Sequence, residues 1–257
     1  MYSENMAAKK IIFSNQKGGV GKTTTAVNLG AYLAQKGSKV LLIDLDSQGN
    51  LSSSVSADPK HKGSYDVIVG KCTPQEAYQD TPVMNLYAIS GGIDLAGLSV
   101  ELVNELAREF FLKNALAPVE KDWDYILVDC PPSLGLVTIN VMCWAEFVII
   151  PMQCEYFAME GLNLLMRTIG NVKKQLNPRL DILGIVFTMF TTRTRLANDV
   201  VDDVTAYFAD KVFQTKIPRN VRLSEAPSHG LPISLYDNTC AGAQGYESLA
   251  EEVMSRV

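Results

Sequence analysis

The chain has 257 residues, 47% of them hydrophobic and 20% charged, which fits one globular domain over residues 1–257 with a full core. No apolar stretch approaches the roughly 20 residues that a membrane-spanning helix needs, and the first residues lack the apolar segment of a secretory signal. Five cysteines without CxxC spacing predict a reduced cytoplasmic protein without structural zinc, and a net charge of −5 argues against a surface basic all round. We expect residues 1–9 to form a flexible extension.

A strand, a glycine-rich loop and a helix are predicted near the start of the chain. The apolar run from Ile11 to Phe13 leads into KGGVGKTT, after which apolar residues recur at helical spacing to Leu33. The bare backbone of such a loop directs several N–H groups into one hollow, and the helix N-terminus adds partial positive charge. A polyphosphate fits there, with Lys22 reaching the outer phosphates and the hydroxyl of Thr23 binding magnesium. The alternative is an ordinary tight turn that carries lysines.

The general phosphate-loop pattern requires glycine where this chain has Gln16, so the strict pattern fails. Lys17 adds a second lysine, one more than cradling a nucleotide requires. KGGVGKTT closely resembles the deviant phosphate loop of the ParA/MinD family of ATPases. The resemblance implies that Lys17 reaches across a dimer interface to the partner's nucleotide. It also implies a set of ATP-binding residues in the loop: Gly18, Gly19, Val20, Gly21, Lys22, Thr23 and Thr24.

Lys39 to Asp44 is predicted to be a buried strand, and Asp46 follows it closely. Two carboxylates at the C-terminal end of a strand lie where ligands bind in doubly wound sheets, although alone they also fit a turn or a cap. DLDSQGN resembles the family's DxDPQGN, in which the second aspartate positions or activates the attacking water. The resemblance implies that Asp46 is catalytic, together with Lys17 and Lys22, and that Asp44 supports magnesium.

The middle of the chain has weaker signals. Leu51 to Gln79 has mixed character, with at most one short helix, and Leu86 to Ile89 predicts a strand. Ser99 is expected to cap a helix that continues through Phe110 and packs in the core.

Asp124 to Asp129 predicts another buried strand, which Pro131 and Pro132 end because proline supplies no N–H group. An aspartate at the end of an apolar strand, downstream of a phosphate loop, suits a magnesium shell, and the alternative is a cap of the next helix. DCPPS resembles switch II of the same family. The resemblance implies that Asp129 supports magnesium and that Pro131 to Gly135 respond to the terminal phosphate.

The second half continues the alternation of strands and helices. Strands are predicted at Phe147 to Pro151 and Ile182 to Phe187, and helices at Met159 to Leu176 and Val200 to Phe208. This alternation is typical of a parallel sheet covered on both faces. The amphipathic segment from Gly245 to Val257 is expected to dock its apolar face on the sheet, and its acidic outer face makes a poor membrane anchor.

A basic segment precedes the C-terminal helix. From Arg193 to Arg222, six basic residues outnumber four acidic ones, a net charge of +2 that by itself favours a solvated face. IPRNVRLSEAPSHG resembles the chromosomal ParA (Soj) type. The resemblance implies that Arg193 and Arg222 contribute to sequence-independent DNA binding by the ATP-bound dimer, through salt-dependent phosphate contacts. It also implies an adenine-contacting loop that includes Pro218, Arg219 and Asn220.

These motifs occur in the family's order along nearly the whole chain, which therefore resembles a ParA/Soj-type ATPase. The resemblance implies an α/β fold: a single doubly wound, mostly parallel sheet with helices on both faces, of the deviant Walker A P-loop type. It implies a cytoplasmic, nucleoid-associated, Mg²⁺-dependent ATPase that forms an ATP-dependent homodimer on non-specific double-stranded DNA. Hydrolysis, stimulated by a ParB-type partner, would release the DNA during chromosome or plasmid segregation.

Three other classes share the loop. A MinD-like positioning ATPase acting on a membrane or protein cargo is expected to carry a basic amphipathic tail. A nitrogenase-reductase-like electron carrier needs cysteines that hold a cluster between subunits, and Cys130 and Cys154 do not fall in those settings. A ligase of the dethiobiotin type would need a substrate pocket instead of a DNA surface.

Overall fold

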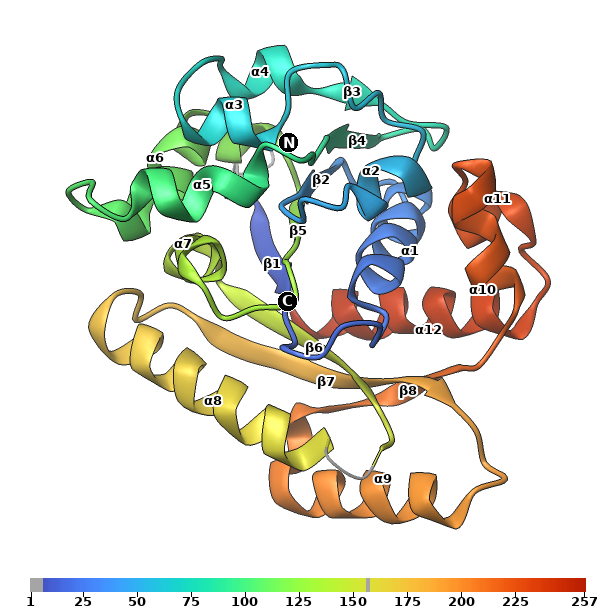
Figure 1. Cartoon of the computed structure of the whole chain (residues 1–257). Helices are drawn as coiled ribbons and strands as arrows, with labels where there is room; N and C mark the ends of the chain where they lie inside the picture. Colours follow the sequence, from blue (N-terminus) through green and yellow to red (C-terminus); the bar gives the residue numbers. More distant parts are fainter. Residues whose placement is uncertain (1–6, 156–157) are drawn as a thin grey trace, which may run out of the picture.

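The computed structural model describes residues 7–155 and 158–257. Most of the predicted flexible extension, residues 1–6, lies outside the described residues, and Lys9 already belongs to the first strand. The strands form one sheet in the order β3-β4-β2-β5-β1-β6-β7-β8, in which every neighbouring pair is parallel except β3 and β4 (Figure 1). The strands are β1 (Lys9–Phe13), β2 (Val40–Asp44), β3 (Gln79–Asp80), β4 (Leu86–Ile89), β5 (Tyr125–Asp129), β6 (Phe147–Gln153), β7 (Asp181–Phe190) and β8 (Val212–Pro218).

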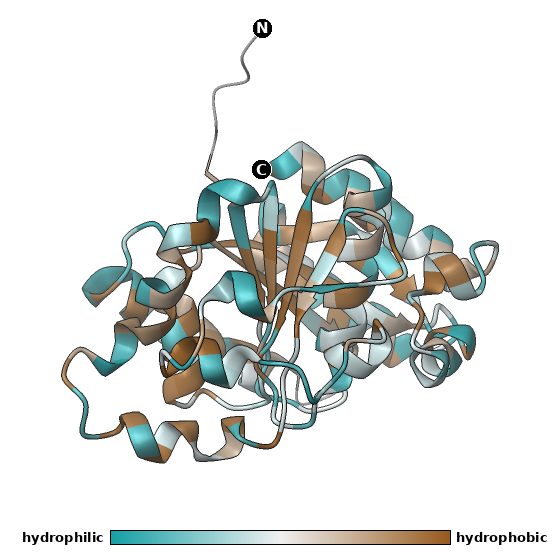
Figure 2. Ribbon diagram, turned by 90° about the horizontal axis from the view of Figure 1, so that it is seen from above, coloured by the Kyte–Doolittle hydropathy of each residue, from teal (hydrophilic) through white to brown (hydrophobic). Residues whose placement is uncertain are grey.

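Both faces of this sheet are buried, which explains why its central strands are almost entirely apolar. Successive side chains of a strand point to opposite faces. Ile12 and Leu41 accordingly belong to one hydrophobic core, while their neighbours Ile11 and Leu42 belong to the other. Figure 2 shows the apolar strands between more polar helices. The predicted fold class is confirmed.

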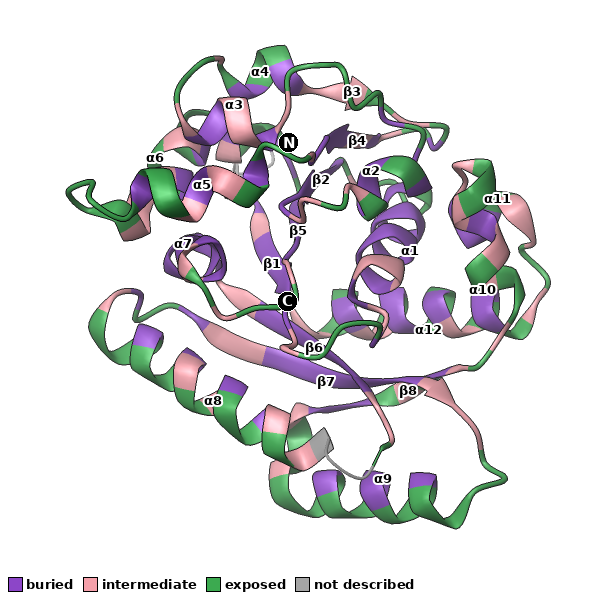
Figure 3. Ribbon diagram, in the orientation of Figure 1, coloured by how far each residue is buried: buried purple, intermediate pink, exposed green. Residues whose placement is uncertain are grey.

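Helices cover the sheet in two layers. Apolar side chains of α5 to α9 pack in one core, and those of α1, α2, α11 and α12 in the other. Figure 3 shows the buried inner and exposed outer sides of α8 and α9. The helices are α1 (Lys22–Gln35), α2 (Asn50–Ser54), α3 (Ser64–Ile68), α4 (Pro74–Ala77), α5 (Leu95–Leu102), α6 (Phe111–Leu116), α7 (Leu136–Trp144), α8 (Ala158–Gln175), α9 (Arg195–Phe208), α10 (Arg222–Glu225), α11 (Ile233–Tyr236) and α12 (Ala241–Arg256).

The C-terminal helix α12 docks as predicted. Tyr246, Leu249 and Val253 are buried in the core that α1 shares. On the outer side, Glu251 accepts a hydrogen bond from Lys36 at 2.8 Å. In the described ranges, no helix combines the length and the apolar character needed to cross a bilayer.

Two predictions for the middle of the chain are wrong. Three short helices, α2 to α4, occur where at most one was expected. The predicted helix from Ser99 through Phe110 is interrupted, because α5 already contains Ser99 and ends at Leu102. Ala107 then takes a left-handed conformation, with φ of 54°, which no α-helix continues through.

Candidate active site

The C-terminal ends of three central strands bring the predicted motifs together. In the sheet register, Asp129 of β5 pairs with Phe13 of β1 on one side and with Asp44 of β2 on the other. Because parallel strands end at the same edge, the loops that follow them meet there. The phosphate loop, the Asp44–Asp46 turn and the end of β5 therefore surround one site.

The phosphate loop lines an open pocket. Gly19 and Gly21 have φ of 74° and 86°, conformations that side chains disfavour. Gly21 immediately precedes α1, so the helix N-terminus faces the loop. The pocket measures about 1060 Å³, and its lining includes Gly18, Gly19, Gly21, Lys22, Thr23, Thr24 and Asp46. Most of the residues predicted to bind phosphate are therefore placed around one cavity.

Strand ends on the other side of the loop hold its backbone. The Oγ1 hydroxyl of Thr188, at the end of β7, donates to the carbonyl of Val20 at 2.7 Å. Nε2 of Gln153, at the end of β6, donates to the carbonyl of Gly19 at 2.8 Å. Val20 itself is buried. Of the residues predicted to bind ATP in the loop, it is therefore one that supports the loop from beneath.

The two lysines of the loop have different environments. Lys22 is only 7% exposed, and its Nζ donates to the carbonyl of Lys17 at 3.2 Å. Burial lowers the pKa of Lys22, while the negative charge of Asp129 opposes that change. Lys17 is exposed and forms an ion pair with Glu155, just beyond β6.

The two aspartates after β2 are placed differently. Asp46 is partly exposed and lines the phosphate pocket, where its Oδ1 accepts a hydrogen bond from the backbone N of Gln48 at 3.0 Å. Asp44 is fully buried, does not line that pocket, and accepts its hydrogen bonds from the backbone N of Asp46 and from Ser52.

Asp129 is fully buried and, like Asp44, does not line the pocket, but it keeps one carboxylate oxygen available for a cation. Its Oδ2 accepts a 2.5 Å hydrogen bond from Oγ1 of Thr23, and within the described ranges its Oδ1 is the one buried side-chain polar atom without a hydrogen-bond partner. Burial, followed by the charge of Asp44, raises its pKa to about 8. A hydroxyl, a carboxylate and phosphate oxygens are ligands that Mg²⁺ prefers. The described part of the chain offers no cluster of three or more His, Cys, Asp or Glu side chains, so phosphate oxygens would complete such a site.

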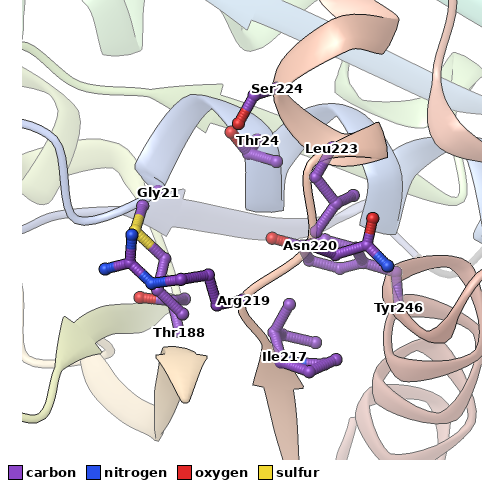
Figure 4. Close-up of a pocket in the computed structure, with 11 residues that line it drawn as sticks. Gly21, Thr24, Thr188, Ile217, Arg219, Asn220, Leu223, Ser224 and Tyr246 are labelled. Atoms are coloured by element: carbon purple, nitrogen blue, oxygen red, sulfur yellow. The ribbon is translucent and has the colours of Figure 1, made fainter. Parts of the chain in front are cut away.

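A second pocket adjoins the first, and Gly21 and Thr24 line both. It measures about 460 Å³, and its lining includes the whole predicted adenine-contacting loop, Ile217, Pro218, Arg219 and Asn220. Figure 4 shows Ile217, Arg219 and Asn220 around this pocket. An aromatic base would find apolar contacts there beside a few polar groups, as small-molecule sites usually provide.

The two predicted DNA-binding arginines lie outside both pockets. Arg193 is exposed in the turn between β7 and α9, and Arg222 is the exposed first residue of α10. NH1 of Arg222 lies 2.9 Å from Oε2 of Glu225. The loops that carry both arginines begin side by side, because the backbone N of Arg219 donates to the carbonyl of Phe190 at 3.1 Å.

Several residues of the site were not predicted from the sequence. Gln48 and Asn50 belong to DLDSQGN, and Leu223, Ser224 and Pro227 belong to IPRNVRLSEAPSHG, but no role at the site was expected of them. Ser53, Ser54, Thr188, Met189 and Tyr246 line the pockets from outside these motifs. Pro132, by contrast, belongs to the segment from Pro131 to Gly135 that was expected to respond to the terminal phosphate, and it lines the first pocket. Position gave a further signal, since Thr188 follows a predicted strand whose end had to reach the ligand-binding edge.

A glycine-rich loop between a central parallel strand and a buried helix, with a buried lysine facing a carboxylate, defines a phosphate-loop nucleotide-binding protein. A family model described as "AAA domain" matches residues 8–182. The chromosome-partitioning ATPase Soj of Treponema pallidum is 57% identical, over 96% of this chain and 98% of that protein. The sporulation initiation inhibitor protein Soj of Bacillus subtilis is 51% identical, over 95% of this chain and 98% of that protein.

Among solved structures, cobyrinic acid a,c-diamide synthase from Mycobacterium smegmatis with a bound ATP analogue and magnesium has a TM-score of 0.84 and 36% identity, covering 95% of this chain and 93% of that one. The chain belongs to the Soj/ParA family of partitioning ATPases. It is accordingly an ATPase, with ATP and Mg²⁺ as its ligands.

Proposed function

We propose that this ATPase is a DNA-segregation switch: ATP joins two copies of the chain into a dimer that binds DNA without sequence preference, and hydrolysis separates them. The observation that carries the proposal is the pair of lysines at the loop, one buried and one exposed. Lys22 serves the nucleotide of its own chain. Lys17 is exposed and is paired only with the half-exposed carboxylate of Glu155, an ion pair that a contact with the nucleotide of a second subunit can replace.

In the proposed reaction, water attacks the terminal phosphate, and Asp46 positions or activates that water. Its place in the pocket lining supports this role. Lys22 of the same chain and Lys17 of the partner subunit stabilise the negative charge of the transferring phosphoryl group. Mg²⁺, when bound, would neutralise charge between the outer phosphates, and Thr23 and Asp129 would hold it. Asp44, the third predicted magnesium residue, is considered separately below.

DNA binding in this proposal depends on dimerisation. Arg193 and Arg222 are exposed within a segment of net charge +2, and Arg222 is ion-paired with Glu225 and Asp237, which DNA phosphates would have to displace. Contacts with phosphates add across two linked protomers, so a weak surface on each can give useful affinity in the dimer. The names of the similar proteins, which are chromosome-partitioning proteins, support segregation as the purpose. The proposal adds nucleoid association and a ParB-type partner that stimulates hydrolysis.

The structure offers little support for a MinD-like role at a membrane. Such a role calls for a free basic amphipathic segment. The apolar face of α12 is instead buried against the sheet, and Glu247, Glu251 and Glu252 belong to the same helix.

Retention on a non-specific DNA column tests the proposal. The chain should be retained with ATP or a slowly hydrolysed analogue and should elute with ADP or without nucleotide. ATP-independent retention, or none under any of these conditions, would contradict it. Vesicles of anionic lipid sedimented with the same nucleotides supply the comparison, and we expect no binding to them.

A further inference from the structure

A buried polar cluster lies beneath the proposed catalytic aspartate. At its centre is the carboxylate of Asp44, which is 0% exposed. Its Oδ1 accepts a hydrogen bond from the backbone N of Asp46 at 3.1 Å. Its Oδ2 accepts from both the backbone N and the Oγ of Ser52, at 2.9 and 2.7 Å. One carboxylate therefore holds both ends of the loop that carries Asp46.

The cluster extends to the loop that follows β4. Oγ of Ser52 also accepts a hydrogen bond from the backbone N of Gly91 at 2.9 Å. Oγ of Ser64 donates to the carbonyl of Asp44 at 2.6 Å, and its backbone N donates to the carbonyl of Ser90 at 2.9 Å. A Cβ atom at Gly91 would lie 2.8 Å from Cγ of Asp44, which leaves no room for a side chain. Three loops thus converge on one buried acid.

Burial makes this arrangement costly unless it is fully hydrogen-bonded. Burial raises the pKa of Asp44, and the hydrogen bonds from Ser52 and Asp46 counteract that shift. A buried charged group with several donors normally specifies one local geometry, because any rearrangement leaves it unpaired. The carboxylate of Asp46 is in turn oriented by the hydrogen bond that it accepts from the backbone N of Gln48.

We propose that Asp44, acting with Ser52, is a positioning residue that sets the place of Asp46 for ATP hydrolysis. Both oxygens of Asp44 already accept hydrogen bonds from its own loop, and neither Asp44 nor Ser52 lines the phosphate pocket, so they act through the loop and not on the nucleotide. This inference rests on the role of Asp46 in the proposed function. It differs from the sequence-based expectation that Asp44 supports magnesium.

Ser52→Ala is the main test, because it removes the hydroxyl that bridges Asp44 and Gly91 without touching a pocket residue. Small misplacement of a catalytic group typically costs up to about a hundredfold in rate, so we expect kcat to fall by roughly ten- to a hundredfold. The KM for ATP and the Mg²⁺ concentration for half-maximal activity should stay as in the wild type. Ser255→Ala, near the C-terminus, is the matched control, because its hydroxyl bonds only to the carbonyl of Glu252.

Asp44→Asn and Asp46→Ala complete the set, with thermal unfolding measured for every variant. Asp44→Asn keeps the side-chain shape, but its amide N–H₂ replaces an oxygen that accepts a hydrogen bond, so two donors would face each other. This variant should therefore also lower kcat, while the Mg²⁺ concentration for half-maximal activity stays unchanged. A raised Mg²⁺ requirement in Asp44→Asn would overturn the inference in favour of a metal role. Wild-type kcat in Ser52→Ala would overturn it as well, and this variant decides the matter if Asp44→Asn fails to fold. A fully active Asp46→Ala would refute the assignment of Asp46 itself.

Discussion

The ammonium group of Lys17 is ion-paired with the carboxylate of Glu155 in the same chain. Both side chains are about half exposed, so water and salt screen the pair and it holds Lys17 only weakly. The lysine proposed to serve a second subunit is therefore held by its own chain in the free protein, and dimerisation must exchange one partner for the other.

Replacing this lysine tests the cross-subunit contact. Lys17→Ala should keep ATP binding, because Lys22 and the loop backbone remain, and should lose ATP-dependent dimerisation. Hydrogen bonds to charged groups contribute about 1.5–3 kcal/mol, and the proposed dimer contains two such contacts, so its dissociation constant should rise by roughly a hundred- to ten-thousandfold. Sedimentation velocity with ATP measures the dimer, and a fluorescent nucleotide measures binding.

Glu155→Gln is the companion variant. It removes the charge that holds Lys17 and keeps the size of the side chain, so dimers should form at an equal or lower ATP concentration.

A Lys17→Ala protein that dimerises like the wild type would contradict the cross-subunit role.

Asp129→Asn tests the magnesium site. Loss of a residue that supports a bound metal typically costs ten- to a hundredfold in metal affinity, so the Mg²⁺ concentration for half-maximal ATPase activity should rise by about that factor. Asp124→Asn is the control, because Asp124 immediately precedes the opposite end of β5, where its Oδ2 accepts a hydrogen bond from the backbone N of Lys39. If both variants need the same Mg²⁺ concentration as the wild type, Asp129 does not support the metal.

The DNA surface is tested by combining Arg193→Ala with Arg222→Ala. ATP-dependent dimers should persist, while retention on DNA should be lost at moderate salt. At low salt, the slope of log affinity against log salt should become shallower by roughly one for each phosphate contact removed. Arg179→Ala, an exposed arginine before the start of β7, is the control. Undiminished retention in the double variant would place the DNA surface elsewhere.

Tyr246 links the C-terminal helix to the phosphate loop, and this link has a pH signature. Its hydroxyl lies 3.2 Å from Oγ1 of Thr25, which donates to the carbonyl of Gly21. Burial raises the pKa of Tyr246 above its ordinary value of about 10. The folded chain therefore keeps a proton that the unfolded chain releases, so stability is complete below pH 10 and falls as the pH rises further.

Tyr246→Phe should lower the free energy of unfolding at pH 7 by about 0.5–1.5 kcal/mol, the usual net contribution of one hydrogen bond. Above pH 10 the variant should lose stability less steeply than the wild type, because phenylalanine does not ionise. Urea unfolding at pH 7 and pH 10.5 measures both effects, with Tyr207→Phe as an exposed control. Parallel stability curves in the alkaline range would exclude Tyr246 as the titrating group.

Sequence patterns predicted those strands and loops whose conformation depends mainly on the residues within the segment itself. The central strands are continuous apolar runs because both faces are covered, and Gly19 and Gly21 of the phosphate loop occupy conformations that other residues disfavour. β8 escaped prediction because it is an edge strand with exposed Gln214 and Lys216, so it lacks the apolar run of an inner strand.

The second pocket, at the predicted adenine-contacting loop, was only partly predictable for a different reason. Its loop residues were identified through a motif, but Thr188 and Tyr246 enter it from β7 and α12, which are remote from that motif in the sequence. No periodicity within one segment records which other segment it will face. The Asp44 cluster could not be predicted for the same reason, since Ser52 and Gly91 contact each other and Asp44 only after three loops have come together in the fold.

The backbone contact between Phe190 and Arg219 joins the ends of β7 and β8 at a place that serves two sides of the molecule. On one side, Arg219 lines the second pocket, which adjoins the phosphate pocket. On the other side, the exposed Arg193 and Arg222 follow a few residues after Phe190 and Arg219, respectively. A change in nucleotide occupancy thus has only a short stretch of backbone to cross before it reaches the arginines, and no relay through the hydrophobic interior is required.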